Sequence, residues 1–238
     1  MKRRILSPAG ITLTVALFAS WLTLVQLRES LITPWCPAAP AQCRAEQLWA
    51  IDRIGFGGED WRWDHLSFIT QNLSGVIAIS GPILLQSVRL ASGALPAAGA
   101  ATLLAEDLLI VLQSVALTGA LKELTHDLTQ RPRPFVYLDP VHRGDEPAHY
   151  TSFFSGHTSF AASALSATVF MAAARGLPLA IVNTGWIISG IITLLTAIGR
   201  ILAGRHFPTD VATASVVGFL CAWGVAKFWR KNYRVGSR

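Results

Sequence analysis

Three short clusters of basic and histidine residues each lie at the end of a long apolar run. They are Arg131-Pro132-Arg133-Pro134, Ser155-Gly156-His157, and Arg200 with His206 and Asp210. Arginine is suited to bidentate binding of phosphate oxygens, and a neutral imidazole can attack phosphorus as a nucleophile. If the fold brings the clusters together, their residue types predict a site for phosphate chemistry.

The third cluster has the most informative spacing. His206 follows Arg200 after five intervening residues, and Asp210 lies four positions beyond His206. A carboxylate one helical turn from an imidazole can fix its tautomer and stabilise its charged form. Because ionisable side chains at a membrane edge are unfavourable unless they are used, the spacing favours a functional role over an ordinary surface turn.

The other two clusters each have a structural alternative. Ser155 is a good helix N-cap, and Gly156 lets backbone N–H groups approach an anion at a helix N-terminus, with His157 in the first turn. Taken alone, that triplet also fits a capped helix with an interfacial histidine. The prolines that alternate with Arg131 and Arg133 restrict the backbone, and the alternative there is a stiff basic loop that touches lipid headgroups.

The elements that carry these clusters have the composition of a membrane protein. The chain has 238 residues, of which 52% are hydrophobic and 14% are charged, whereas a soluble domain carries about 25% charged residues. Several apolar runs approach the ~20 residues that cross a bilayer: Ile5–Leu27, His65–Val88, Leu103–Leu121, His157–Ala174, Leu177–Ile198 and Phe207–Phe228. We expect a single all-α domain over residues 1–238, a polytopic membrane helix bundle with about six transmembrane helices.

The charge pattern predicts an orientation in the cell (inner) membrane. Lys and Arg gather at both chain ends and in the connections that hold Arg89 and Arg175, and positive charge near helix ends marks the cytoplasmic side. We therefore expect both termini in the cytoplasm and the three clusters on the periplasmic or exterior face. The first run could instead be a cleaved signal peptide. No nucleic-acid partner is expected, because the basic tails are short and adjoin membrane runs, and no obligate protein partner is evident.

The longest outer connection, residues 28–64, is rich in tryptophan and carries two cysteines. Cys36 and Cys43 could form a disulfide if the loop is periplasmic, or remain two free thiols. Ala45–Ile54 has the spacing of a short amphipathic helix. Tryptophan favours the membrane–water boundary, so the loop is expected to anchor there or to help admit a lipid substrate.

Together the clusters resemble the type 2 phosphatidic acid phosphatase superfamily, whose pattern is Lys, six residues and Arg-Pro; Pro-Ser-Gly-His; then Ser-Arg, five residues, His, three residues and Asp. This chain has Arg133-Pro134, Phe154-Ser155-Gly156-His157 and Gly199-Arg200 with His206 and Asp210 at the same spacing. The lysine departs from the pattern. Counting back from Arg133 reaches His126, whereas Lys122 lies one helical turn earlier. We take His126 as the aligned residue and keep Lys122 as a contributor.

The resemblance implies a metal-independent, cofactor-free phosphatase. His206 would form a phosphohistidine, with Asp210 orienting it and His157 as general acid and then base. The phosphate oxygens would be held by Arg133, Arg200, Ser155 and Gly156, with Arg131 as a further candidate. The substrate would be a membrane lipid phosphate or diphosphate hydrolysed at the outer membrane face.

Three other functions stay open on sequence alone. A lipid phosphotransferase would use the same residues. A catalytically silent lipid-phosphate-binding homologue is an alternative because the lysine position is altered. A channel or transporter would more often place ionisable residues near the middle of its spans.

Overall fold

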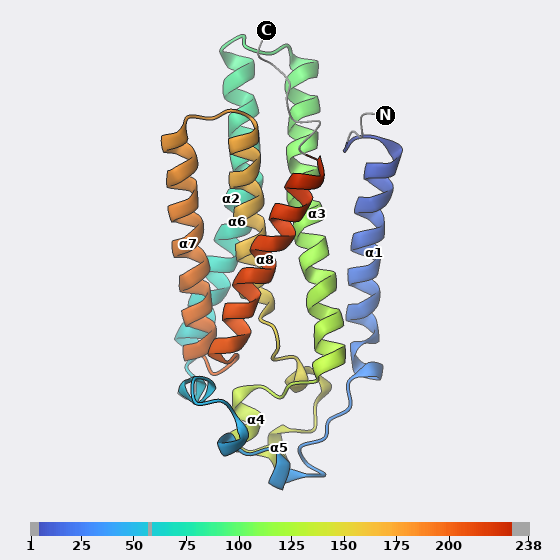
Figure 1. Cartoon of the computed structure of the whole chain (residues 1–238), viewed down its shortest axis with the longest axis vertical. Coiled ribbons are helices and arrows are strands. Elements are labelled where there is room, and N and C mark those ends of the chain that lie inside the picture. The colour runs from blue at the N-terminus through green and yellow to red at the C-terminus, as the bar shows by residue number, and fades with distance from the viewer. Residues whose placement is uncertain (1–4, 57–58, 230–238) are drawn as a thin grey trace.

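The computed structural model describes residues 5–56 and 59–229, and its long helices run side by side as a bundle (Figure 1). These helices are α1 (Pro8–Leu31), α2 (Trp61–Ala91), α3 (Ala97–Thr129), α6 (Gly156–Ala174), α7 (Leu179–Leu202) and α8 (Pro208–Trp229). Successive long helices run antiparallel, and the connections between them lie at alternating ends of the bundle (Figure 1). Within the described ranges there is no strand, so the predicted all-α membrane bundle is confirmed.

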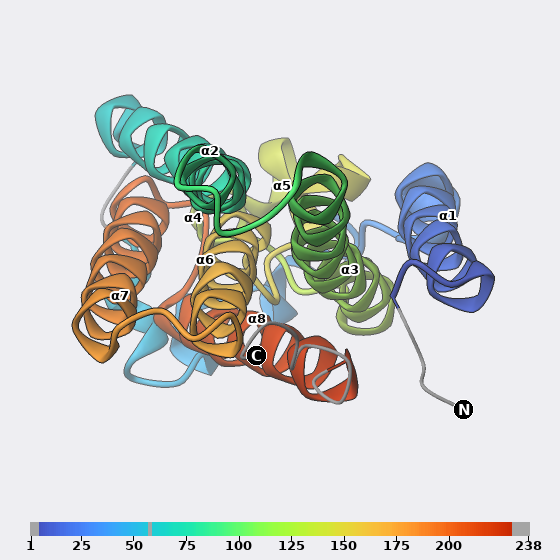
Figure 2. The same cartoon turned by 90° about the horizontal axis from the view of Figure 1, so that it is seen from above.

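Among the described residues, five helices are long and apolar enough to cross a membrane by length and composition: α1, α2, α3, α7 and α8. The sixth predicted crossing, α6, has 19 residues and is interrupted by serines and threonines. Figure 2 shows α6 in the middle of the bundle, with α2, α3, α7 and α8 around it and α1 beyond α3. Because its sides face protein, α6 can carry hydroxyl groups that a lipid-facing helix would leave unsatisfied.

The predicted runs match the long helices, but most helices extend beyond them. α3 runs from Ala97 to Thr129, beyond the expected Leu103–Leu121. Side-chain caps set several starts: Ser7 accepts from the N–H of Gly10 and Asp60 from that of Arg62. The basic chain ends used to predict orientation, residues 2–4 and 230–238, lie outside the described residues.

Small residues allow the helices of the site to approach closely. A Cβ on Gly218 of α8 would lie 2.5 Å from the carbonyl oxygen of Ser159 on α6. A Cβ on Gly199 of α7 would lie 2.9 Å from the Cβ of Ser67 on α2. Glycine at these two positions therefore brings α8 against α6 and α7 against α2, as small residues do in membrane bundles.

The connections at one end of the bundle fold over it (Figure 1). The α1–α2 connection contains the short helices η1 (Pro40–Gln42), η2 (Ala45–Gln47) and η3 (Asp52–Gly55). The α3–α6 connection contains α4 (Pro134–Leu138), α5 (Pro140–Arg143) and η4 (Pro147–Tyr150). The predicted amphipathic helix over Ala45–Ile54 is wrong, because only the two separate 3-10 turns η2 and η3 form there.

A disulfide closes the α1–α2 connection, and a buried tyrosine joins this connection to the α3–α6 connection. The disulfide links Cys36 and Cys43, with their Cα atoms 5.5 Å apart. The Tyr150 hydroxyl accepts from the Cys36 N–H at 2.9 Å and donates to the Gly144 carbonyl at 2.7 Å. The α1–α2 connection is therefore held against the end of the bundle that carries the three clusters.

Candidate active site

The turn between α7 and α8 places His206. The carbonyl of Arg200, in the last turn of α7, accepts from the N–H groups of Arg205 at 3.1 Å and His206 at 3.2 Å. Gly204 makes this reversal at a φ of +64°, a conformation that glycine adopts without a steric penalty. Pro208 then starts α8, where its missing N–H is not needed. The turn leaves His206 buried, with 2% of its surface exposed.

One hydrogen bond defines the tautomer of His206. Its Nδ1 lies 2.7 Å from the Ser152 carbonyl oxygen, which can only accept, so Nδ1 carries the proton. The Nε2 lone pair is therefore left for reaction. Asp210, expected to orient the imidazole, has its Oδ2 3.7 Å from Nδ1, and the same oxygen accepts from the Ser152 hydroxyl at 2.5 Å. Asp210 thus acts on the ring largely through Ser152.

The surroundings of His206 keep its ring neutral. Burial lowers the pKa of His206 well below its usual value, and the positive charges of Arg200 and Arg133 lower that pKa further. A neutral imidazole with a defined tautomer is the state that a histidine nucleophile requires.

The structure brings the three sequence clusters together through backbone and side-chain hydrogen bonds. The Ser155 N–H donates to the Asp210 carbonyl at 3.4 Å, which joins the start of α6 to the first turn of α8. The Ser152 N–H donates to the Arg131 carbonyl at 3.0 Å. Arg133 donates through Nη2 to the Thr151 hydroxyl at 3.0 Å. The predicted convergence of the clusters is therefore present in the fold.

A cavity of about 430 Å³ opens among the basic residues. It is lined by Arg133, His157, Arg200 and Arg205, together with Trp61, Asp64, His65 and Phe68. The Nε atoms of Arg133 and Arg200 are buried and have no hydrogen-bond partner among the described residues. Burial and the charges of Arg200, Arg205 and Arg28 lower the pKa of Arg133 to about 9, so the group stays cationic at neutral pH. Such a cavity suits an anion.

An aspartate that the sequence analysis did not single out lies in this cavity. Asp64, in the first turn of α2, forms ion pairs with Arg200 and, at 3.2 Å, with Arg205. Arg205, the residue before His206, therefore lines the site as well. An acidic residue in a first helical turn is common on dipole grounds alone, so the sequence carried no signal for this role.

The start of α6 has the predicted cap. The Ser155 side chain accepts from the N–H of Thr158 at 3.4 Å, and Ser155 is fully buried. A Cβ on Gly156 would lie 3.2 Å from Cδ of Lys122. Glycine at this position therefore lets the Lys122 side chain lie across the helix N-terminus.

The geometry separates Lys122 from His126, the two candidates for the family's lysine. Lys122 lines a second cavity together with Gly156 and His157, and its Nζ is paired with Glu123. The Nε2 of His126 lies 3.1 Å from the Phe154 carbonyl, and His126 lines neither of these two cavities. Alignment by spacing favours His126, but in the structure the side chain that lies against the start of α6 is that of Lys122.

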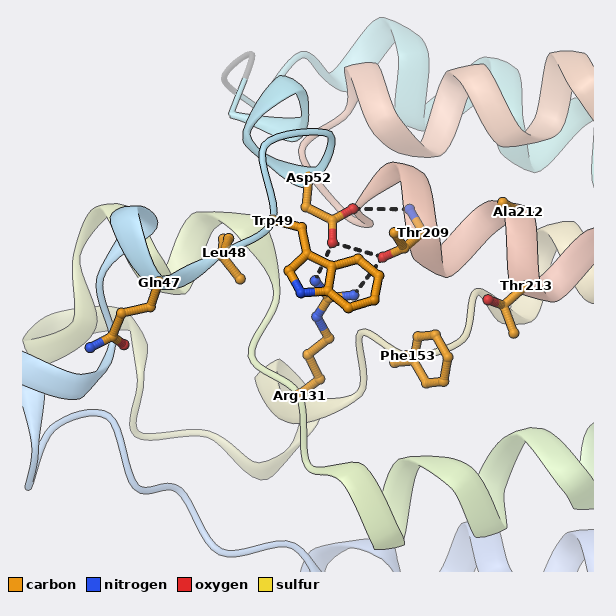
Figure 3. A pocket seen from close by; sticks show the side chains of 9 residues that line it. All are labelled: Gln47, Leu48, Trp49, Asp52, Arg131, Phe153, Thr209, Ala212 and Thr213. Atoms are coloured by element: carbon orange, nitrogen blue, oxygen red, sulfur yellow. Dashed lines mark hydrogen bonds and ion pairs between the residues drawn. The ribbon is translucent and has the colours of Figure 1, made fainter.

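Arg131 does not lie in the cavity that holds Arg133. Its guanidinium donates to Asp210 at 2.5 Å, Asp52 at 2.7 Å and the Thr209 hydroxyl at 2.9 Å. It lines a different pocket, between the α1–α2 connection and α8 (Figure 3). The structure therefore does not place Arg131 as a phosphate ligand, since carboxylates already occupy it.

Within residues 5–56 and 59–229 there is no group of three or more His, Cys, Asp or Glu side chains that could hold a metal ion. The profile of the PAP2 superfamily, the type 2 phosphatidic acid phosphatases, matches residues 107–234. That segment includes Lys122, His126 and all three clusters. No curated protein and no solved structure matches the chain.

Proposed function

The chain belongs to the PAP2 superfamily, and from that membership and the site geometry we propose that it hydrolyses a lipid phosphate or diphosphate. Superfamily members are generally phosphatases that act on phosphate esters. The helices fit a membrane protein. We place the site on the periplasmic or exterior face of the cell membrane, with both chain ends in the cytoplasm, as positive charge at the opposite helix ends indicates.

The observation that carries the proposal is the pair of buried guanidinium groups in one cavity. Arg133 and Arg200 each leave Nε without an acceptor among the described residues, and both line the cavity with His157. An unsatisfied buried donor is unfavourable, so the arrangement is most stable when an anion with several acceptor oxygens enters. A phosphate group meets that requirement bidentately at each arginine.

In the proposed first step, Nε2 of His206 attacks phosphorus and a P–N bond forms as the P–O bond to the leaving group breaks. His157 gives its proton to the leaving oxygen. Arg133, Arg200 and Lys122 hold the equatorial oxygens, whose charge the transition state retains. The Gly156 N–H, at the start of α6, adds a donor of helix-terminal character.

In the second step, water attacks the phosphohistidine. His157, now neutral, accepts a proton from that water, the P–N bond breaks, and orthophosphate leaves with His206 neutral again. The Ser152 carbonyl keeps the proton on Nδ1 of His206 throughout, so Nε2 is regenerated as the reactive nitrogen.

A second cavity supports a lipid substrate. It has a volume of about 280 Å³ and joins Lys122, Gly156 and His157 to Val115, Phe160 and Trp21 deeper in the bundle. Val115 precedes Lys122 by seven residues on α3, which is about 10 Å along a helix axis. Because His157 lines both this cavity and the arginine cavity, we propose that a substrate with its phosphate between the arginines places its apolar tail in this second cavity.

The experiment is phosphate release by purified protein in detergent, assayed on a panel of phosphatidic acid, phosphatidylglycerophosphate, lipid A and undecaprenyl diphosphate. We expect release from at least one member, inhibition by vanadate and no effect of EDTA. Transfer of labelled phosphate to a second lipid, without release, would assign the site to a phosphotransferase. Binding of the lipids with neither reaction would overturn the proposed activity.

A further inference from the structure

Asp52 links the α1–α2 connection to the start of α8. Its Oδ1 accepts from the Thr209 N–H at 3.0 Å and its Oδ2 from the Thr209 hydroxyl at 2.8 Å. The Asp52 carboxylate also accepts from Nη2 of Arg131 at 2.7 Å. Figure 3 shows Asp52 meeting Thr209 and Arg131 at this point. Only 2% of Asp52 is exposed, so its bonds form away from bulk water.

The bond to the Thr209 backbone makes Asp52 a cap for α8. Thr209 is the second residue of that helix, where an N–H has no partner inside the helix. A side-chain carboxylate satisfies the N–H and interacts favourably with the positive end of the helix dipole. This cap comes from 157 positions away in the chain. It therefore fixes the first turn of α8, which holds Asp210, to the loop.

Arg131 continues the connection from Asp52 to Asp210. Its Nη2 donates to Asp52 and its Nη1 to Oδ1 of Asp210 at 2.5 Å. The guanidinium carbon lies 4.3 Å from the centre of the Phe207 ring, which adds a cation–π contact. A guanidinium held by two buried carboxylates and a ring has little freedom to turn, so Asp210 is held in one orientation.

Asp210 passes that orientation to the imidazole. Its Oδ2 accepts from the Ser152 hydroxyl at 2.5 Å and from the Phe207 N–H at 2.9 Å. The Ser152 carbonyl accepts from Nδ1 of His206. The contacts thus run from Asp52 through Arg131, Asp210 and Ser152 to His206.

We propose that Asp52 is a positioning residue that sets the orientation and tautomer of His206 through this chain of contacts. The predicted effect on the reaction rate rests on the proposed function. Arg131 pairs with two carboxylates, those of Asp52 and Asp210. Replacing Asp52 by Asn removes the negative charge of the first. The guanidinium then pairs with Asp210 alone, and Asp210 turns toward it and away from Ser152. Attack on phosphorus becomes slower, whereas Arg133 and Arg200 still bind phosphate as before.

The first measurement is steady-state kinetics of Asp52→Asn. Loss of an outer partner of a site residue typically lowers activity by about 10–100-fold, so we expect kcat to fall in that range with KM changed less than about twofold. The matched control is Asp107→Asn, which also removes a buried carboxylate paired with an arginine, Arg175, but at the other end of the bundle. We expect the control to be less thermostable but to keep its kcat.

The second measurement is the ¹⁵N spectrum of histidine-labelled protein in micelles, with the His206 signals assigned by their loss in His206→Ala. We expect one Nδ1–H tautomer in the wild type and a mixture in Asp52→Asn. If Asp52→Asn does not fold, Thr209→Val removes only a hydroxyl from the same network, and a smaller change in the same direction is expected.

Two results would overturn the proposal: a wild-type kcat in Asp52→Asn, or a reduced kcat with the His206 tautomer unchanged. A wild type that releases phosphate from no lipid would instead remove the proposed function. The spectra would still test the contact chain in that case, so the two failures are distinguishable.

Discussion

The two ends of the bundle each bury an arginine against two carboxylates, and at the end that carries the clusters further arginines line a cavity. At the end away from the clusters, Arg175 pairs with Asp107 at 2.7 Å and with Glu106 at 3.0 Å. The Gln86 amide donates to Asp107 at 2.7 Å. At the other end, Arg131 is held between Asp52 and Asp210 in a similar way.

The difference lies in the arginines next to Arg131. Arg133 and Arg200 line a cavity and keep Nε donors without protein acceptors in the described part of the chain. The ion pairs of Arg175 join the end of α6 to α3. Their role is structural, because breaking a buried ion pair destabilises a fold. The cluster around Arg131 joins segments too, but it supports neighbours that are arranged to bind an anion. Buried charge therefore points to a site where the charged groups line a cavity, as Arg133 and Arg200 do.

The largest expected effect comes from removing the nucleophile. His206→Ala should lower kcat for lipid phosphate hydrolysis by at least about 10⁴-fold, because no other group can take up the phosphoryl group. Phosphate release measures the loss, and the thermal midpoint in detergent should stay near that of the wild type. Activity within tenfold of the wild type would remove His206 from this role.

The next largest effect is expected on replacing an arginine that lines the cavity, compared with an arginine that is paired outside it. Arg133→Ala should lower kcat/KM by about 10²–10³-fold, as removal of a transition-state donor does in other enzymes. Arg143→Ala is the matched control in the same connection, because Arg143 is half-exposed and pairs with Glu59. The control should retain at least half of the wild-type kcat/KM, and equal losses in both variants would contradict the assignment.

Lys122 and His126, one helical turn apart on α3, can be compared directly by replacing each with alanine. Lys122→Ala should lower kcat/KM by about 10²-fold, since the side chain contributes charge at the N-terminus of α6. His126→Ala should have the smaller effect, because the buried His126 ring is already engaged with the Phe154 carbonyl. The reverse order of losses would return the role to His126.

The pH profile tests the neutral state of His206. Because the pKa of His206 is lowered by burial and by nearby arginines, the reactive neutral form persists as pH falls. The acid limb of kcat/KM that belongs to His206 should therefore lie below the ordinary histidine value of about 6.5. Correction for the second ionisation of the substrate phosphate, measured by ³¹P shift, isolates that limb. A limb at the ordinary value would show an exposed or anion-paired imidazole.

The smallest effect on catalysis is expected at the far end. Asp107→Asn should cost about 3 kcal/mol of stability, because it removes one of the two carboxylates that pair with the buried Arg175. Thermal unfolding in detergent checks the stability, and initial rates well below the unfolding temperature should match the wild type. A large loss of kcat without unfolding would show that the two ends are coupled.

The sequence predicted the bundle and the meeting of the clusters because both depend on local signals. Apolar length identifies a span without knowledge of its neighbours, and alternation of spans puts the ends that carry His157 and His206 on one side. Capping explains Ser155. The lower apolarity of α6 reflects its central place, which is set by tertiary packing and not by the helix itself.

Long-range partners could not be predicted in this way. Asp52 and Asp64 look like ordinary polar residues near helix starts, and only the folded chain places them 2.7 Å from Arg131 and in contact with Arg200. The position of Lys122 was misleading for a related reason. Spacing counts residues along the chain, whereas the fold decides which residue of α3 faces the start of α6, and that residue is Lys122.

Chemical trapping of the intermediate tests the central claim most directly. Wild-type protein quenched in base during turnover of a labelled lipid phosphate should carry an acid-labile phosphoryl group on Nε2 of His206, located by peptide mass spectrometry. The Arg133→Ala variant should accumulate it more slowly. Turnover at the normal rate with His206 unmodified, or with the label on another residue, would contradict the account.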